Sequence, residues 1–397
     1  MSRRSSLAAI GAATVALLTI ISNGALAQET GGLFEEPAAG PLVIVGGELE
    51  SSNEPVFRAI LGLRFDGRPI CVLPTTTANA GQATSTLVEV FERYGGTGSA
   101  IAVTQLFTKP GRADKEKIAR TLEGCGGFFF TDGDSAGVVN TLRPGGRSTL
   151  AEQAILRVHR RGGVISGSNA GAALMSETMI QGGSSDDALA YGIVNDKGAP
   201  GLWLQTGMGF FHGGLADQQN TNEGRTGRLL VALAGLPAAK RGFGIDNNTA
   251  LVIDRGRARV IGASQVIVLE EVHAGTGAIK LDGARFRVLL LGNGDEYNLM
   301  NGIASVGARK EAMRLSDVTP IAPAGPWVAT GLPLYIVDLS VSTAKTGEFT
   351  SKGYRFTLAK ESGFDARAWE IPDGKHVPHG FTAGWFQMDI RLDDKPN

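Results

Sequence analysis

The chain has 397 residues, which corresponds to two or three domains at about 150 residues each. Its 38 Lys and Arg residues nearly balance its 39 Asp and Glu residues, and this near-neutrality argues against a nucleic-acid-binding protein and against a polybasic membrane module. A hydrophobic share of 43% supports a sizeable buried core and excludes a disordered chain. The two cysteines are too few for a disulfide-rich scaffold or a Cys-based zinc cluster.

Residues 1–27 have the pattern of a signal peptide. Arg3 and Arg4 precede an uncharged apolar stretch, and Ala25-Leu26-Ala27 supplies a small-x-small cleavage site. The stretch is shorter than the about 20 apolar residues that a membrane-spanning helix needs, so a cleaved signal is favoured over an anchor. The pattern predicts an exported protein, periplasmic or extracellular, without membrane contact after cleavage. In an oxidising compartment Cys71 and Cys125 could pair, although the sequence alone leaves this open.

After a small, acidic linker at residues 28–40, the chain alternates short apolar runs with helical patterns. Continuous apolar runs indicate strands that are buried on both faces of a parallel sheet. This βαβ alternation predicts an α/β domain with a doubly wound, mostly parallel sheet over residues 41–270, whose ligands would bind at the carboxyl ends of the strands. The expected strands are 42–45, 70–73, 100–103, 128–130 and 164–166, and the expected helices are 85–94, 115–122 and 151–161.

The pattern changes towards the C-terminus, where short strands are separated by turn residues and no long helix is expected. Residues 271–397 are therefore predicted to form a β-rich extension of the α/β domain. The strands expected after about residue 250, some of them before the extension, are 250–253, 258–261, 266–269, 287–291, 334–337 and 385–390.

Residues 167–171, Gly-Ser-Asn-Ala-Gly, have the form of a nucleophile elbow. They follow an expected strand and precede an expected helix over residues 172–176. In such a turn the central side chain is held above the sheet, and the N-terminus of the next helix offers N–H groups to an oxyanion. The central residue is Asn169, whose carboxamide has no ionisable proton for a histidine to remove. The turn thus has the architecture of an acyl-transfer site without its nucleophile.

Further motifs occur in a definite order along the chain. Together with the elbow they comprise residues 42–47, 72–75, 131–134, 167–172, 207–218, 225–229 and 244–251. Over about residues 41–295 the chain therefore resembles the cyanophycinases and the related serine peptidases that include aspartyl dipeptidase. The resemblance implies a class I glutamine amidotransferase-like fold and a peptide or cyanophycin-like polymer as substrate, with β-linked aspartyl-arginine or isoaspartyl bonds. It implies no cofactor, and it leaves a homodimer open.

The departures from the family pattern fall on the reactive positions. The resemblance equates the catalytic serine and histidine of the family with Asn169 and Gln219. It also equates a glutamate with Asn247 and a glutamine with Ser135. Because carboxamides do not titrate near neutral pH, they provide neither a nucleophile nor a base. We therefore expect a pseudoenzyme that recognises its ligand without hydrolysing it.

Several candidate substrate-binding residues match the family or lie beside the elbow. Arginine forks bind carboxylates bidentately, which suits a ligand clamp, but a buried pair between an aspartate and an arginine would look the same in sequence. The sequence therefore leaves both a ligand clamp and an internal ion pair open. The candidates are Ser135, Ser168, Asp217, Gln218, Arg225 and Arg228.

The alternative function is an active cyanophycinase or isoaspartyl peptidase that uses a displaced nucleophile. Ser168 lies one residue before the apex of the elbow, and His212 is the base that would serve it. His159 lies in a helix-like run beside Arg160 and Arg161, which favours a solvated helix face.

Two further segments contain candidate residues for a catalytic acid and for a metal site. Asp186 and Asp187 could supply a catalytic acid, although solvation in a loop is favoured. His376-x-x-His379 with Asp373 resembles a metal-ligand spacing, but zinc sites need three or four ligands with fixed spacing. A surface loop is therefore favoured, and no metal site is predicted.

Overall fold

A computed structural model describes residues 39–74, 80–107, 111–317, 319–329, 331–369 and 380–393, and residues 36–397 form one compact unit. The predicted signal peptide and the linker up to residue 38 lie outside the described residues. Within the described part of the chain, no helix has the length and apolar character that crossing a bilayer requires.

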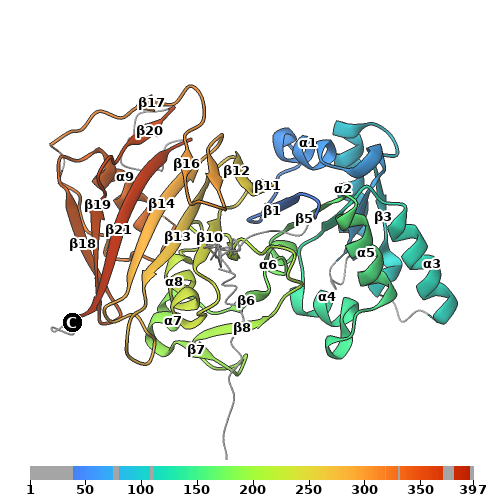
Figure 1. The fold of residues 1–397 in the computed structure, drawn as a ribbon, viewed down its shortest axis with the longest axis horizontal. Helices are drawn as coiled ribbons and strands as arrows, with labels where there is room; N and C mark the ends of the chain where they lie inside the picture. The colour runs from blue at the N-terminus through green and yellow to red at the C-terminus, as the bar shows by residue number, and fades with distance from the viewer. Residues whose placement is uncertain are drawn as a thin grey trace, which may run out of the picture. The chain divides into compact units, whose positions relative to one another are not determined.

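A nine-stranded mixed sheet forms the first half of this unit (Figure 1). Its strands are β1 (Leu42–Val45), β2 (Ile70–Leu73), β3 (Ala100–Ala102), β4 (Gly127–Phe130), β5 (Val164–Ser168), β11 (Thr249–Asp254), β12 (Arg257–Gly262), β15 (Glu296–Asn298) and β16 (Ala304–Ser305). Parallel pairing gives the order β1-β5-β4-β2-β3, and antiparallel pairing continues the sheet from β1 through β11, β12 and β15 to β16.

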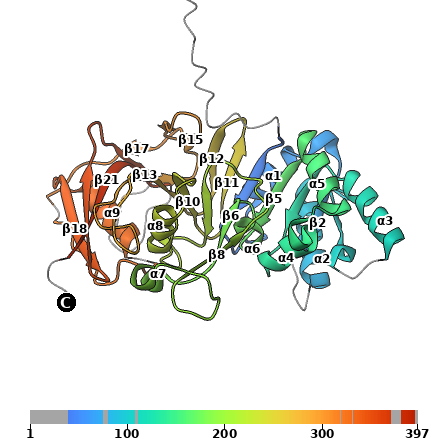
Figure 2. The same cartoon turned by 60° about the horizontal axis from the view of Figure 1, so that its bottom comes forward.

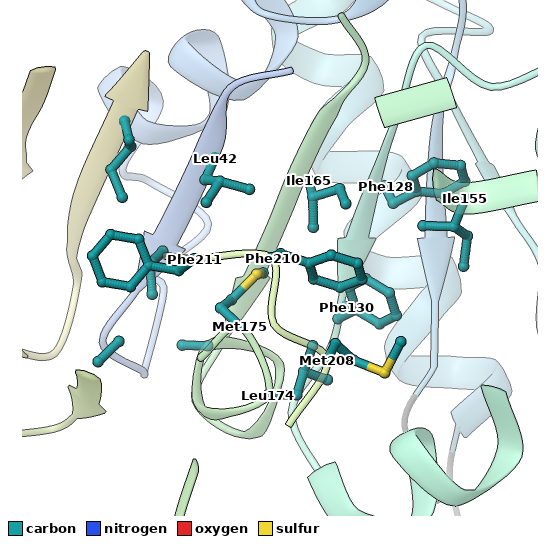
Figure 3. Close-up of a cluster of buried hydrophobic side chains, with 14 of the residues drawn as sticks. Leu42, Phe128, Phe130, Ile155, Ile165, Leu174, Met175, Met208, Phe210 and Phe211 are labelled. Carbon is teal, nitrogen blue, oxygen red and sulfur yellow. The ribbon is translucent and has the colours of Figure 1, made fainter. Parts of the chain in front are cut away.

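Helices cover both faces of the parallel strands. The helices are α1 (Glu54–Gly62), α2 (Ala80–Gly95), α3 (Arg112–Glu123), α4 (Ser135–Leu142) and α5 (Leu150–Arg160). Successive residues of β1 point to opposite faces, so Val43 packs with the buried side chains of α1 and α2, and Ile44 packs with those of α3, α4 and α5. Figure 3 shows the second of these clusters around Leu42, Phe128 and Ile165. The predicted α/β class with a doubly wound, mostly parallel sheet is confirmed.

A second sheet joins the end of the α/β region to the β-rich extension. It comprises β9 (Leu215–Gln218), β10 (Arg241–Ile245), β13 (Gln265–His273), β14 (Arg285–Gly292), β17 (Glu311–Ala312), β18 (Thr346–Ser351), β19 (Tyr354–Lys360), β20 (Ala366–Ala368) and β21 (Thr382–Leu392). The order β9-β10-β13-β14-β21 runs through both regions without interruption. The predicted boundary between residues 270 and 271 therefore falls inside β13, and the two regions share one sheet.

Shorter elements complete the described chain. They are β6 (Thr178–Gly182), β7 (Ile193–Val194) and β8 (Leu202–Thr206), which form a third sheet, and α6 (Ala170–Ala173), α7 (Ser185–Tyr191), α8 (Thr226–Gly235) and α9 (Leu332–Val341). Buried residues of α8 and α9 belong to the same hydrophobic cluster as those of β13, β14 and β21 (Figure 2).

Two secondary-structure predictions need correction. The run 334–337, predicted as a strand, lies in the buried helix α9, which has Pro333 in its first turn. A helix that is apolar on most of its surface gives the same short apolar run as a buried strand, so periodicity does not separate them. The helix predicted over 172–176 is α6, which begins at Ala170 and ends at Ala173.

A disulfide bond joins Cys71 of β2 to Cys125, which lies two residues before β4. The Cα atoms of the two cysteines are 5.8 Å apart, and both side chains are fully buried. The pairing that the sequence left open is therefore present in the structure, and it links two neighbouring strands of the parallel sheet.

We expect removal of this disulfide to lower the free energy of unfolding. The bond closes a loop with a sequence separation of 54 residues, and the loop-entropy relation assigns such a loop about 4 kcal/mol. Urea denaturation of the oxidised protein and of Cys71→Ala/Cys125→Ala should show this difference. A reducing agent should shift the oxidised protein but not the double variant, and equal stability of the two proteins would contradict the prediction.

Candidate functional site

The elbow is a strand, a one-residue turn and a short helix. Asn169 follows β5 with φ 51° and ψ −108°, and its carbonyl accepts hydrogen bonds from the N–H groups of Ala172 and Ala173. A Cβ atom on Gly167 would lie 2.5 Å from the carbonyl oxygen of Gly171, so the turn requires glycine there. The side chain of Asn169 is partly exposed at the tip of this turn.

Asn169 and Gln219 flank the carboxyl end of β1. The N–H of Asn169 donates to the carbonyl of Val45 at 3.2 Å, and the N–H of Gln219 donates to the carbonyl of Gly46 at 2.8 Å. Gln219 follows β9 directly and also has a positive φ of 51°. The structure therefore brings the two predicted catalytic positions to either side of the same two residues, at the edge of the sheet where ligands of α/β proteins bind.

A third carboxamide, Asn247, belongs to this site. A Cβ atom on Gly47 would lie 2.9 Å from Cγ of Gln219 and 3.1 Å from Oδ1 of Asn247, so a glycine at position 47 allows both side chains to approach. The Nδ2 group of Asn247 donates to Oε2 of the exposed Glu48 at 2.8 Å. Asn169, Gln219 and Asn247 are hereafter called the carboxamide site.

Two acceptor oxygens at this edge of the sheet are buried without a hydrogen-bond donor among the described residues. They are Oε1 of Gln218, which is the last residue of β9, and Oδ1 of Asn247. Buried polar atoms are almost always hydrogen-bonded, because an unpaired one costs about 1–3 kcal/mol. The two oxygens are therefore suited to a ligand that donates hydrogen bonds.

Backbone strain also concentrates at this edge. Besides Asn169 and Gln219, the loop residues Glu48 and Asn248 have positive φ values of 43° and 52°. A hydrogen bond from the N–H of Asn248 to the carbonyl of Gly47 ties these two loops together at 2.7 Å. Such conformations cost about 1–3 kcal/mol each and cluster at functional sites.

Asp132 faces the N-terminus of the elbow helix. Its Oδ1 atom lies 3.5 Å from the N–H of Ala170 and 2.6 Å from the N–H of Gly133. The N–H of the residue after the apex is the group that would stabilise an oxyanion in an elbow enzyme. In this chain that group faces a carboxylate, which would repel a developing negative charge. The sequence motif contains Asp132 but gave no sign of this contact.

Asp217 and Arg228 form a bidentate ion pair in the interior. Nη2 of Arg228 donates to Oδ1 of Asp217 at 2.6 Å and Nε donates to Oδ2 at 2.9 Å, and both residues are at most 5% exposed. The remaining Nη1 group donates to the carbonyl of Gly183 at 2.9 Å. Since the carboxylate of Asp217 is already paired bidentately with Arg228 in the interior, the structure favours the internal ion pair over the ligand clamp for these two residues.

Arg225 differs from Arg228. Its guanidinium is half-buried and donates to the carbonyl of Gln218 at 3.1 Å, and it forms no ion pair with another described residue. Burial, followed by the charge of Arg228, lowers the pKa of Arg225 below its ordinary value. Of the two arginines predicted to contact a ligand, Arg225 is the one whose guanidinium is not paired with a carboxylate of another described residue.

The two candidate serines have different surroundings. Ser135 is buried at the start of α4, where its hydroxyl donates to Oε1 of Gln181 at 2.9 Å. Ser168 is the last residue of β5 and lies opposite Val45 of β1. Its hydroxyl forms no hydrogen bond with another described side chain or backbone group, and 8% of the residue is exposed.

The structure places His212 away from Ser168. His159 is buried, and its Nδ1 atom lies 2.9 Å from the carbonyl oxygen of Gly163, just before the amino end of β5. Burial lowers the pKa of His159, and the nearby charge of His212 lowers it further. The exposed His212 lines a cavity with Glu177 and Thr178, and no hydrogen bond joins it to Ser168. The prediction of a solvated His159 is wrong, because its ring packs against Phe210 with ring centroids 6.3 Å apart.

The remaining acidic and metal candidates lie elsewhere. Asp186 and Asp187 are in the first turn of α7 rather than in a loop, and Asp186 pairs with Lys352 at 3.4 Å. The His376 and His379 segment lies outside the described residues. In the remainder of the chain, no group of three or more His, Cys, Asp and Glu side chains could hold a metal ion.

The chain is similar in sequence to several cyanophycinases. The cyanophycinase of Trichormus variabilis is 27% identical over 270 residues, which cover 65% of this chain and 85% of the relative. The cyanophycinase of Synechococcus elongatus is 29% identical over 196 residues, covering 47% of this chain and 57% of the relative. The chain is therefore similar to cyanophycinases over about two thirds of its length. No family profile matches it.

Two solved structures are similar to the cyanophycinase-like chain at a lower level. A peptidase from an acI-B1 Actinobacterium is 16% identical, with a TM-score of 0.41 over 57% of this chain and 89% of that protein. A putative peptidase E from Listeria monocytogenes is 15% identical, with a TM-score of 0.39 over 57% of this chain and 100% of that protein.

The ion pair of the cyanophycinase-like chain leads to a stability prediction. Arg228→Met leaves the carboxylate of Asp217 buried without a counter-charge, which should cost about 3–5 kcal/mol in the free energy of unfolding. Arg225→Met removes a half-buried arginine without an ion pair and should cost less than about 1 kcal/mol. Urea denaturation measures both. Equal losses for the two variants would contradict the structural role of Arg228.

The stability of this cyanophycinase-like chain should also depend on His159. An unfolded histidine gains a proton below about pH 6.5, whereas the buried, neutral His159 gains one only at lower pH. The unfolded state therefore binds more protons in that interval. As the pH is lowered through it, the free energy of unfolding decreases by up to about 1.4 kcal/mol per pH unit. His159→Gln should show a shallower slope between pH 7.5 and 5.5. His273→Gln removes an exposed histidine at the end of β13 and is the control, and identical slopes for all three proteins would refute the assignment.

Proposed function

We propose that this chain is a non-hydrolytic, cyanophycinase-like binding protein. Its ligand is a β-linked aspartyl-arginine polymer or an isoaspartyl peptide, bound at the carboxyl ends of the strands. The observation that carries the proposal is the carboxamide site, in which Asn169, Gln219 and Asn247 surround the end of β1. The family assignment supports the class of ligand, and the chemistry of these side chains supports the absence of hydrolysis.

Hydrolysis of an amide bond needs a nucleophile, a base and a stabilised oxyanion. Asn169 provides no attacking oxygen that can be deprotonated, and Gln219 accepts no proton near neutral pH. The carboxylate of Asp132, 3.5 Å from the N–H of Ala170, opposes an oxyanion at the third required position. All three requirements are therefore unmet at the same elbow.

The same site retains groups that suit binding. The guanidinium of Arg225 matches a ligand carboxylate, while Oε1 of Gln218 and Oδ1 of Asn247 match a ligand N–H group. The nearby carboxylate of Glu48 favours a cationic donor such as a guanidinium. An aspartyl-arginine unit carries a carboxylate and a guanidinium, and an isoaspartyl peptide carries a carboxylate and amide N–H groups.

Export is part of the proposal. The buried disulfide between Cys71 and Cys125 supports an oxidising compartment, because such bonds form and persist in secreted and periplasmic proteins. It agrees with a signal peptide over residues 1–27 and with a periplasmic or extracellular location. The homodimer stays a prediction.

The alternative is an active hydrolase in which Ser168 acts as the nucleophile. The observation that favours it is the Ser168 hydroxyl, which has no hydrogen-bond partner among the described residues. It lacks a base in hydrogen-bonding contact, because His212 lines a separate cavity with Glu177 and Thr178. The non-hydrolytic function is therefore the better supported of the two.

The purified protein is expected to bind β-aspartyl-arginine polymer without releasing dipeptide. Asn169→Ser/Gln219→His/Asn247→Glu restores three residue types of the family, and Asp132→Asn removes the carboxylate that opposes the oxyanion, so turnover is expected only in the variant that combines all four changes. Gln219→His alone is the matched control, because it adds a base without a nucleophile. Binding is measured by isothermal titration calorimetry, and released dipeptide is measured by chromatography.

Two outcomes would reject the proposal. Turnover by the unmodified protein would reject the non-hydrolytic function, and labelling by a fluorophosphonate that Ser168→Ala abolishes would identify the displaced nucleophile. Failure of the unmodified protein to bind both the polymer and isoaspartyl peptides would reject the ligand class.

A further inference from the structure

A polar cavity lies near the amino end of β1, away from the carboxamide site. It has a volume of about 400 Å³ and is lined by the C-terminal part of α1 and by β11, β12 and β15. Figures 1 and 2 both show α1 beside the hairpin of β11 and β12. Val252 in its wall pairs with Val43 of β1, whereas the elbow residue Ser168 pairs with Val45. The cavity is therefore separate from the carboxamide site and lies towards the amino end of the strand.

The pleat of the sheet arranges charges of both signs around this cavity. Arg257 and Arg259 alternate with the buried Ala258 on β12, so the two guanidiniums project to the same face. Register places Asp254 of β11 opposite Arg257, and Glu296 of β15 opposite Arg259. Neighbouring strands lie about 4.8 Å apart and alternate residues about 7 Å apart, so cations and anions alternate over a short distance.

These charges are largely unused within the protein. Arg259 is exposed and forms no hydrogen bond or ion pair with another described residue. Arg257 makes only a long contact of 3.8 Å with Glu296, and 73% of its side chain is exposed. The contact of Asp254 with Arg255 is equally long, at 3.8 Å. The groups are therefore available to a ligand that carries both carboxylates and cations.

The charged surface continues beyond the first cavity. A second cavity of about 190 Å³ shares Arg257 and Glu296 with it and extends along β15 to Ser305 of β16. The two cavities together form a groove from α1 to the edge of the sheet. A groove of this length fits an extended chain better than a single small molecule.

We propose that this groove binds a second stretch of the aspartyl-arginine polymer whose recognition at the carboxamide site is the proposed function. Polymer carboxylates pair with Arg257 and Arg259, and polymer guanidiniums pair with Asp254 and Glu296. Each exposed ion pair contributes little on its own, so the groove acts only on a ligand with many repeats tethered to the first site. It therefore distinguishes the polymer from a single dipeptide.

The test compares two ligands and three proteins. Titration calorimetry with β-aspartyl-arginine polymer and with the β-aspartyl-arginine dipeptide is performed on the unmodified protein, on Arg257→Gln/Arg259→Gln, and on the control Arg160→Gln/Arg161→Gln. The control removes the same charge from exposed positions of α5 and its C-terminus. Circular dichroism and thermal unfolding verify that each variant is folded.

The groove variant should bind the polymer about fivefold to tenfold more weakly, with dipeptide affinity unchanged within about twofold. The control should match the unmodified protein for both ligands. Equal polymer affinity of the groove variant and the unmodified protein would reject the groove and leave the proposed function intact. Loss of dipeptide affinity in the groove variant would also reject a polymer-specific surface. Absence of binding of either ligand to the unmodified protein would reject both proposals.

Discussion

Two backbone hydrogen bonds at the end of β1 hold the candidate site together. The carbonyls of Val45 and Gly46 accept from the N–H groups of Asn169 and Gln219, which come from different sheets and are 50 residues apart in the chain. Because both donors have positive φ values, these bonds also help to maintain two strained turns. The position of every other group in the site depends on this junction, whatever side chains the turns carry.

The junction fixes the backbone of the site independently of the side chains that the turns carry. Backbone bonds and glycine contacts fix the turns, so the side chains at Asn169, Gln219 and Asn247 are not needed for the fold. The buried pair of Asp217 and Arg228 holds α8 against β9 independently of any ligand. Neutral carboxamides at these three positions are therefore compatible with an intact backbone at the site, which is what the proposed binding function requires.

Much of the α/β region could be predicted from the sequence, because strands buried on both faces have continuous apolar runs. The same signal failed for α9, whose surface is apolar on most sides. Motif order placed Asn169 and Gln219 at one site, but it did not reveal the contacts of Asp132 and Glu48. Those contacts join segments far apart in the chain, so local sequence patterns do not predict them. The burial of His159 was missed for the same reason, since its neighbours Arg160 and Arg161 are exposed.

The continuous second sheet makes the α/β region and the C-terminal extension depend on each other. β13 pairs with β10 of the α/β region on one side and with β14 of the extension on the other. Without the extension, β13 would become a long, apolar edge strand with unpaired backbone groups, which is a template for aggregation. Removal of residues 271–397 would therefore require changes in β13, so neither region is a self-contained folding unit.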